Sequence, residues 1–245
     1  MKILALDIET APATVYAWGL WDQNVGLNQI VSHVRVLCFA AKFLGEKKIH
    51  FYSEWTDGHD VMVAKAHELL SEADAVMHWN GNRFDIPHLN REFVEVGMGP
   101  PVPFKNIDLM LVVRKEFKFM SNKLENIADQ LSLEGKVKHE GFGMWTGVMA
   151  GDTKAQRKMA EYNKRDVTLL EDMYEVLRPW IRNHPSIPLY DAVDNDACPT
   201  CGSTHRQRRG YMCTQVSRFV QYQCQDCKRY YRSSKADGRV SVVGT

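Results

Sequence analysis

Hydrophobic and polar residues alternate along the first part of the chain as they do in β-strands separated by helices. In residues 2–9, Asp7 and Glu9 fall on the same face of a strand as Ile3 and Ala5, because successive strand side chains point to opposite sides. The other face carries Leu4, Leu6 and Ile8. Farther along, apolar spacings of three and four residues predict helices. The pattern therefore predicts an α/β fold. The other predicted elements are strands at 34–43, 48–52 and 75–78, and helices at about 59–71, 86–96, 123–131 and 153–181.

Glycine and proline mark the segments between these elements. Residues 97–104 contain three prolines and two glycines and are predicted to be a loop. The glycine-rich residues 132–151 predict a long loop, which would face the substrate if it lay beside an active site; an ordinary surface loop is the alternative. His184-Pro185 and Pro188 predict a linker. The predicted divisions are a domain at 1–183, a linker at 184–194, a small module at 195–232 and a flexible tail at 233–245.

Charge is distributed unevenly along the 245 residues. The net charge is +1, but residues 1–194 carry −5 and residues 195–245 carry +6. A basic segment of this kind is typical of contact with a polyanion, and a solvated charged surface is the alternative. No stretch approaches the roughly 20 apolar residues of a membrane span, and Asp7 interrupts the apolar start before a secretory core can form. We therefore expect a cytoplasmic protein without a membrane partner.

Two segments of the first half place acidic residues where packing alone would not favour them. Asp7 and Glu9 share one face of the first strand, where two buried carboxylates repel each other unless a cation lies between them. A solvated sheet edge is the alternative. Asp85 ends the segment Asn80-Gly-Asn-Arg-Phe-Asp85 and precedes a predicted helix. Taken alone, it is explained by a helix cap.

A third acidic residue lies on the last predicted helix of the domain. Asp166 follows Tyr162 by four residues, on the apolar stripe of that helix, and an acid there requires a compensating partner. Carboxylate oxygens are the ligands that Mg²⁺ and Mn²⁺ prefer. Two such ions about 4 Å apart can activate a water and stabilise the leaving oxygen of a phosphodiester. The predicted ligand set is Asp7, Glu9, Asp85 and Asp166.

The order of these segments resembles the three motifs of the DnaQ-like, or DEDD, superfamily of 3′-to-5′ exonucleases. The motifs are Asp-x-Glu at 7–9, Asn-x-x-x-Phe-Asp at 80–85 and Tyr-x-x-x-Asp at 162–166, with supporting matches at 107–108 and 123–127. The tyrosine four residues before the last acid resembles the one that characterises the DEDDy branch, which includes most proofreading domains of family B DNA polymerases. The resemblance covers about residues 1–180. It implies a ribonuclease H-like fold, with a mixed five-stranded sheet flanked by helices. Because the sequence contains no polymerase-sized region, we expect a stand-alone nuclease.

The resemblance also implies a role for each matching residue. Asp7, Glu9 and Asp166 would hold a first Mg²⁺ or Mn²⁺ ion and its nucleophilic water. Asp7 would bridge to a second ion, with Asp85 as the other protein ligand of that ion. Tyr162 would orient the water. The reaction would release nucleoside 5′-monophosphates from the 3′ end of single-stranded DNA. Residues expected to hold the terminal nucleotide are Thr10, Asn80 and Phe84.

Five of the six cysteines lie in the last fifth of the chain. Two Cys-x-x-Cys pairs separated by 22 residues fit two knuckles that hold one tetrahedral zinc ion, and a redox pair would not need this arrangement. Alternating apolar residues between the pairs predict strands, so the segment resembles a zinc ribbon that needs its metal to fold. For Cys213 and His205, a packed thiol and a surface histidine are favoured over substitute ligands. The predicted zinc ligands are Cys198, Cys201, Cys224 and Cys227.

The cysteine-rich segment also interleaves basic and aromatic residues. These side chains could pair with phosphates and stack on bases, and the alternative is that the rings fill a small core. Nucleic acid is the favoured partner of this segment, and a replication or repair protein is the alternative. The residues concerned are Arg206, Arg208, Arg209, Arg218, Lys228, Arg229 and Arg232, with Tyr211, Phe219, Tyr222, Tyr230 and Tyr231.

Other functions are compatible with parts of the same pattern. An exoribonuclease would use the same metal pair, and no feature of the sequence indicates recognition of a 2′-hydroxyl group, which would distinguish RNA from DNA. A nucleic-acid binding protein without catalysis is disfavoured by the presence of all four carboxylates and the tyrosine. A structure-selective endonuclease on the same fold is disfavoured by Tyr162.

Overall fold

The computed structural model of the chain describes residues 1–133, 141–192 and 194–243. These residues form two compact units. The larger unit consists of residues 2–114 and 118–173, and the smaller unit of Met1, residues 115–117 and the chain from Tyr174 onward. Within the described ranges, no helix combines the length and apolarity that crossing a membrane would require.

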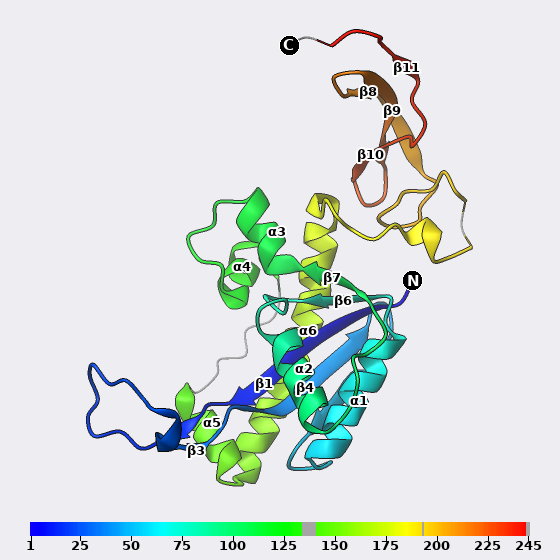
Figure 1. Cartoon of the computed structure of the whole chain (residues 1–245). Helices are drawn as coiled ribbons and strands as arrows, with labels where there is room; N and C mark the ends of the chain where they lie inside the picture. Colours follow the sequence, from blue (N-terminus) through cyan, green and yellow to red (C-terminus); the bar gives the residue numbers. More distant parts are fainter. Residues whose placement is uncertain (134–140, 193, 244–245) are drawn as a thin grey trace. The chain divides into compact units, whose positions relative to one another are not determined.

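A mixed five-stranded sheet forms the centre of the larger unit (Figure 1). In order across the sheet, its strands are β5 (His50–Ser53), β4 (Arg35–Phe43), β1 (Ile3–Ala11), β6 (Ala75–His78) and β7 (Lys105–Asp108). Strand β1 pairs antiparallel with β4 and parallel with β6. The predicted sheet and α/β class are therefore confirmed. A two-stranded sheet, which the sequence pattern did not predict, joins β2 (Thr14–Val15) to β3 (Ile30–Ser32).

Helices cover both faces of this sheet (Figure 1). The α-helices among the described residues are α1 (His59–Glu72), α2 (Asp85–Glu95), α3 (Leu109–Glu116), α4 (Leu124–Gln130), α5 (Phe142–Met149) and α6 (Thr153–Leu177). The even-numbered aliphatic residues of β1 pack against α1 and α2 in one buried cluster. Ala11 and Cys38 pack instead with Met144 of α5 and Met159 of α6. Asp7 and Glu9 therefore lie on the side of α5 and α6.

The glycine-rich segment differs from its prediction. Residues 142–149, expected to be part of a long loop, form α5, while residues 134–140 lie outside the described residues. The physical reason is the close approach of two helices, because a Cβ atom at Gly147 would lie 2.8 Å from Cβ of Ala155 in α6. Glycine here serves helix packing, whereas the sequence pattern associated it with a loop.

Two further elements differ from the prediction. Strand β7 has four residues and α3 has eight, and both are too short to produce a clear periodic pattern. The last helix of the domain was predicted to run to residue 181, but α6 ends at Leu177 and a 3₁₀ turn (Arg178–Trp180) follows it. Pro179 explains the change, because it cannot continue the hydrogen-bond pattern of an α-helix.

The smaller unit contains an antiparallel sheet. Its strands are β8 (Arg206–Cys213), β9 (Ser217–Cys224), β10 (Tyr230–Arg232) and β11 (Gly238–Arg239). Strand β9 pairs with each of the other three. The strands predicted between the cysteine pairs are therefore present. Strand β11 lies in the segment expected to be a tail, and its two residues carry no pattern that would predict it. A 3₁₀ turn (Ile187–Leu189) precedes this sheet, and another (Leu27–Gln29) precedes β3 in the larger unit.

Candidate active site

Three of the predicted acidic residues meet on one side of the sheet. One carboxylate oxygen from each of Asp7, Glu9 and Asp166 lies within 4.8 Å of the other two. Two of these acids project from the same face of β1, as the alternation predicted, and the third comes from α6. Glu9 is only 8% exposed, and the other two are partly buried. The helix and the strand thus bring together acids that are more than 150 positions apart in the sequence.

The fourth acid, Asp85, is the first residue of α2 and contacts the backbone of β1. Its Oδ1 accepts a hydrogen bond of 3.1 Å from the N–H of Ile8, and its side chain is 3% exposed. Strand β6 pairs with β1 through Ile3, Leu4 and Ala5, so Asp85 takes over as acceptor beyond the end of that pairing. The helix-cap interpretation is not supported, because α2 has no side-chain cap and this carboxylate turns toward β1.

Burial raises the pKa values of all four carboxyl groups, and repulsion between the acids adds to this for Asp7 and Glu9. Burial, followed by repulsion from the neighbouring acids, raises the pKa of Asp7 well above its usual range and that of Glu9 to about 8. Burial also raises the pKa values of Asp85 and Asp166 to about 7. Ionising these carboxyl groups in the ion-free protein therefore carries an energetic cost, which a bound cation would remove. The donor set, oxygen atoms only, fits a hard divalent ion.

Two neutral side chains donate hydrogen bonds to the acids of β1. The fully buried Asn163 donates to Oδ2 of Asp7 at 2.6 Å. Trp145 of α5 hydrogen-bonds to Glu9 and lowers its pKa. Neither residue was predicted to belong to the site. Asn163 follows the motif tyrosine but has no periodic or compositional signal of its own, and Trp145 lies in the segment predicted to be a loop.

Tyr162 lies beside the acids, as the motif spacing predicted. Its phenol hydrogen-bonds to Asp166, one helical turn later, and this bond lowers the pKa of that carboxyl group against the effect of burial. Burial, with repulsion from the nearby acids, raises the pKa of the phenol itself. Tyr162 therefore remains a hydrogen-bond donor throughout the ordinary pH range.

The second motif forms a tight turn between β6 and α2. Asn80 has a positive φ of 65°, and its N–H donates to Oδ1 of Asp108 at 3.1 Å. The N–H of Gly81 donates to Nδ1 of His78 at 3.0 Å, and a Cβ atom at Gly81 would lie only 2.4 Å from that ring. Glycine is thus required at this position. Phe84, the aromatic residue of the motif, is 40% exposed.

A pocket opens next to Glu9, at the end of β1. It has a volume of about 300 Å³ and is lined by Thr10, Pro12, Gly141, Phe142 and Trp145. The pairing of β1 with β4 shifts register between Glu9 and Thr10. Thr10 was predicted to contact the terminal nucleotide and lines this pocket. Asn80 and Phe84, predicted for the same role, lie on the turn before α2 and are not among the described residues that line this pocket.

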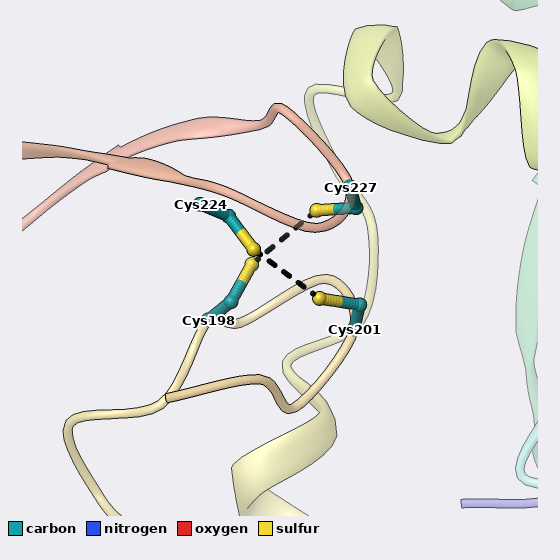
Figure 2. A group of neighbouring side chains, drawn as sticks. All are labelled: Cys198, Cys201, Cys224 and Cys227. Carbon is teal, nitrogen blue, oxygen red and sulfur yellow. Dashed lines mark hydrogen bonds between the residues drawn. The ribbon is translucent and has the colours of Figure 1, made fainter. Parts of the chain in front are cut away.

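The four predicted zinc ligands meet in the smaller unit (Figure 2). Their Sγ atoms lie within 4.8 Å of one another, and Sγ–Sγ distances are 3.6 Å for Cys198 and Cys227 and 3.5 Å for Cys201 and Cys224. Sulfur atoms that converge in this way suit a tetrahedral metal ion. Cys213 lies outside the cluster and is exposed, so its interpretation as a packed thiol is wrong.

Comparison with known proteins assigns the larger part of the chain. The sequence profile of the RNase H superfamily matches residues 4–178. No curated protein matches the chain. The structure is similar to that of the family B DNA polymerase from the hyperthermophilic archaeon Pyrobaculum calidifontis, with a TM-score of 0.55 and 17% identity. The similarity covers 73% of this chain but only 24% of the polymerase, so it concerns the fold. The profile match and the mixed five-stranded sheet flanked by helices establish that the chain belongs to the RNase H superfamily.

Proposed function

We propose that the protein is a metal-dependent 3′-to-5′ exonuclease of the DEDDy type that acts on single-stranded DNA. The observation that carries this proposal is the meeting of Asp7, Glu9 and Asp166 within 4.8 Å, with Tyr162 hydrogen-bonded to the last of them. A solvated sheet edge would not bury these acids or raise their pKa values. Membership of the RNase H superfamily and the polymerase-like fold support a nuclease.

The acids would hold two Mg²⁺ or Mn²⁺ ions. Asp7, Glu9 and Asp166 would bind one of them, and Asp7 and Asp85 the other. When bound, such ions supply a nucleophilic water and stabilise the leaving oxygen of the phosphodiester. The raised pKa values of the carboxyl groups support this role, because the cluster lacks a basic side chain among the groups that shift the pKa of Asp7.

The remaining residues would position the substrate and the attacking water. Tyr162 stays protonated and is hydrogen-bonded to Asp166. At this position its hydroxyl group can orient a water by hydrogen bonding. The pocket next to Glu9, lined by Thr10 and the rings of Phe142 and Trp145, suits a terminal nucleotide, since aromatic rings stack on any base. Asn80 and Phe84 would contact the same nucleotide from the turn before α2. Hydrolysis would then release one nucleoside 5′-monophosphate at a time.

Digestion of end-labelled oligonucleotides tests this function. We expect shortening of single-stranded DNA from its 3′ end in the presence of Mg²⁺ or Mn²⁺, a 5′ label remaining on progressively shorter products. Asp7→Ala should abolish this activity. Asp60→Ala, at an exposed acid of α1, is the matched control and should retain it. Preferential digestion of RNA would favour an exoribonuclease, while internal cuts or equal activity of native protein and Asp7→Ala would contradict the proposal.

We further propose that the cysteine cluster holds one structural zinc ion in a zinc ribbon. Its four thiols converge, and the small sheet around them has few other buried side chains. Measurement of bound zinc in the purified chain should give one ion per molecule, and Cys224→Ser should lose it. Cys213→Ser is the matched control, because this exposed thiol lies outside the cluster. Equal zinc loss from both variants would contradict the assignment.

The basic residues of the ribbon would contact nucleic acid through its phosphates. Arg208 and Arg218 lie over the ring of Tyr211, at 5.0 and 4.2 Å from its centroid, and Arg206 lies over Tyr222 at 4.6 Å. These ring faces contact arginines of the module itself, which favours phosphate contact over base stacking. Arg208→Gln should weaken binding and reduce the salt slope by about 1. An unchanged slope would favour a replication or repair protein as the partner.

A further inference from the structure

We propose that Asn163 is a positioning residue that holds Asp7 in the orientation required for metal binding. This inference rests on the proposed function. Asn163 is the residue after the motif tyrosine, and its side chain has no exposed surface. An amide that is fully buried normally satisfies its hydrogen-bonding groups, so its partners indicate its role.

The two N–H groups of the Asn163 amide are directed at one residue. Nδ2 donates to Oδ2 of Asp7 at 2.6 Å and to the backbone oxygen of Asp7 at 3.1 Å. The amide oxygen faces the thiol of Cys38, at 4.0 Å from Sγ. Holding both the backbone and the carboxylate of one residue restricts the rotation of that side chain. The amide therefore fixes which carboxylate oxygen remains free for an ion.

A neutral donor is the appropriate group at this position. The charged groups that shift the pKa of Asp7 are the acids Asp166, Asp85 and Glu9. A lysine or arginine in place of the amide would neutralise part of this charge and compete with a cation. An amide orients the carboxylate and leaves its charge available. Neutral hydrogen-bond donors of this kind commonly orient metal ligands from outside the coordination sphere.

Asn163 also connects the two elements that supply the ligands. It lies three residues before Asp166 on α6, so both side chains fall on the same side of the helix. The two hydrogen bonds join this side of α6 to β1 at Asp7. The amide therefore helps to set the separation between the carboxylates of Asp7 and Asp166, which must bind the same ion.

Direct measurement of Mn²⁺ binding tests the inference without relying on activity. The full chain, with zinc bound to its cysteine cluster, is titrated with Mn²⁺ in the absence of nucleic acid. Free Mn²⁺ is followed by electron paramagnetic resonance. We expect Asn163→Ala and the nearly isosteric Asn163→Leu to weaken binding about 10- to 100-fold. Asp7→Ala defines the signal that belongs to the acidic site.

Met159→Ala is the matched control for a purely structural effect. Met159 lies one turn earlier on α6 and is fully buried, but packs in the apolar cluster. This variant should lower the melting temperature and keep the native Mn²⁺ affinity. The inference is overturned if the Asn163 variants bind Mn²⁺ as the native chain does, or if Met159→Ala weakens binding as much as they do.

The two proposals fail in different ways. A chain whose Mn²⁺ affinity depends on Asp7 and Asn163 but which shortens no nucleic acid would refute the exonuclease and leave the positioning role intact. An active exonuclease with a Mn²⁺ affinity insensitive to Asn163 would refute the positioning role alone. Absence of any Asp7-dependent Mn²⁺ binding would overturn both.

Discussion

Replacing Asp85 with asparagine should stabilise the ion-free protein, and the gain should depend on pH. Asp85 is 3% exposed, and burial raises its pKa from 3.8 to about 7. Asparagine keeps an oxygen that can accept the hydrogen bond from the N–H of Ile8. The substitution therefore removes the ionisable group while retaining its principal contact.

The sign and size of the effect follow from the difference in proton affinity. Because the folded protein holds this proton more tightly than the unfolded chain, native stability is lost as pH rises from about 4 to about 7. A pKa difference of about three units lowers the free energy of unfolding by at most about 4 kcal/mol at pH 8, at 1.36 kcal/mol per unit. At pH 5 the same pKa difference lowers the free energy of unfolding by only about 1.5 kcal/mol. The advantage of Asp85→Asn over the native protein should thus grow by about 2 to 3 kcal/mol between pH 5 and pH 8.

Urea unfolding of both proteins measures this advantage. The buffer is freed of Mg²⁺ and Mn²⁺, and zinc remains bound to the cysteine cluster. Both proteins contain the same cysteines, so the pH dependence of that cluster cancels in the difference. Saturating Mn²⁺ should stabilise the native protein more than the variant, because the variant lacks one ligand. A stability difference between variant and native that stays constant from pH 5 to pH 8 would refute the electrostatic reasoning.

Three further substitutions have distinct expected outcomes. Gly81→Ala should destabilise the protein by about 1 to 3 kcal/mol by thermal unfolding, because its Cβ would meet the buried ring of His78 at 2.4 Å; an equal effect from Gly99→Ala, which has open space, would contradict this. Trp145→Phe should raise the Mn²⁺ concentration needed for nuclease activity, since it removes the hydrogen bond to Glu9; an unchanged activation curve would count against it. Glu92→Gln should lose about 1 to 3 kcal/mol of stability in urea, because Glu92 accepts hydrogen bonds from the N–H of Val36 and from His59. These contacts, with Arg91, lower the pKa of Glu92, so this loss should shrink below about pH 4 as the native carboxyl group becomes protonated; a loss that is the same at pH 3 and pH 7 would contradict the assignment.

The acids of β1 were predictable from local pattern, while those of other elements were not. Alternation along a strand determines that Asp7 and Glu9 share a face, and the structure confirms it. Nothing local determines that Asp85 and Asp166 approach the same strand. Their place in the site was inferred from the order of three motifs. Taken alone, Asp85 suggested a helix cap, and only the packing of α2 beside β1 directs it to the N–H of Ile8.

The residues that orient the acids were missed for a different reason. The role of Asn163 depends on the contact between α6 and β1, which is a property of tertiary packing. Trp145 was hidden because glycines around it suggested a loop, although Gly147 allows α5 to approach α6 closely. In contrast, the spacing of the two Cys-x-x-Cys pairs predicted their convergence directly, since four thiols at these positions have few other uses in so small a unit.

The same repulsion that weakens the ion-free fold should strengthen ion binding. Burial raises the pKa values of Asp85 and Asp166 to about 7, and repulsion from both acids helps to raise that of Asp7, so part of the folding free energy is used to hold the acids together. Divalent ions bound by Asp7 together with these acids would recover this energy in addition to their own coordination. The two quantities are therefore linked, because any substitution that relieves the repulsion also removes what attracts the ion. For Asp85→Asn we accordingly expect a gain in ion-free stability to accompany weaker Mn²⁺ binding, whereas a substitution such as Asn163→Ala, which leaves the charges in place, should weaken binding without that gain.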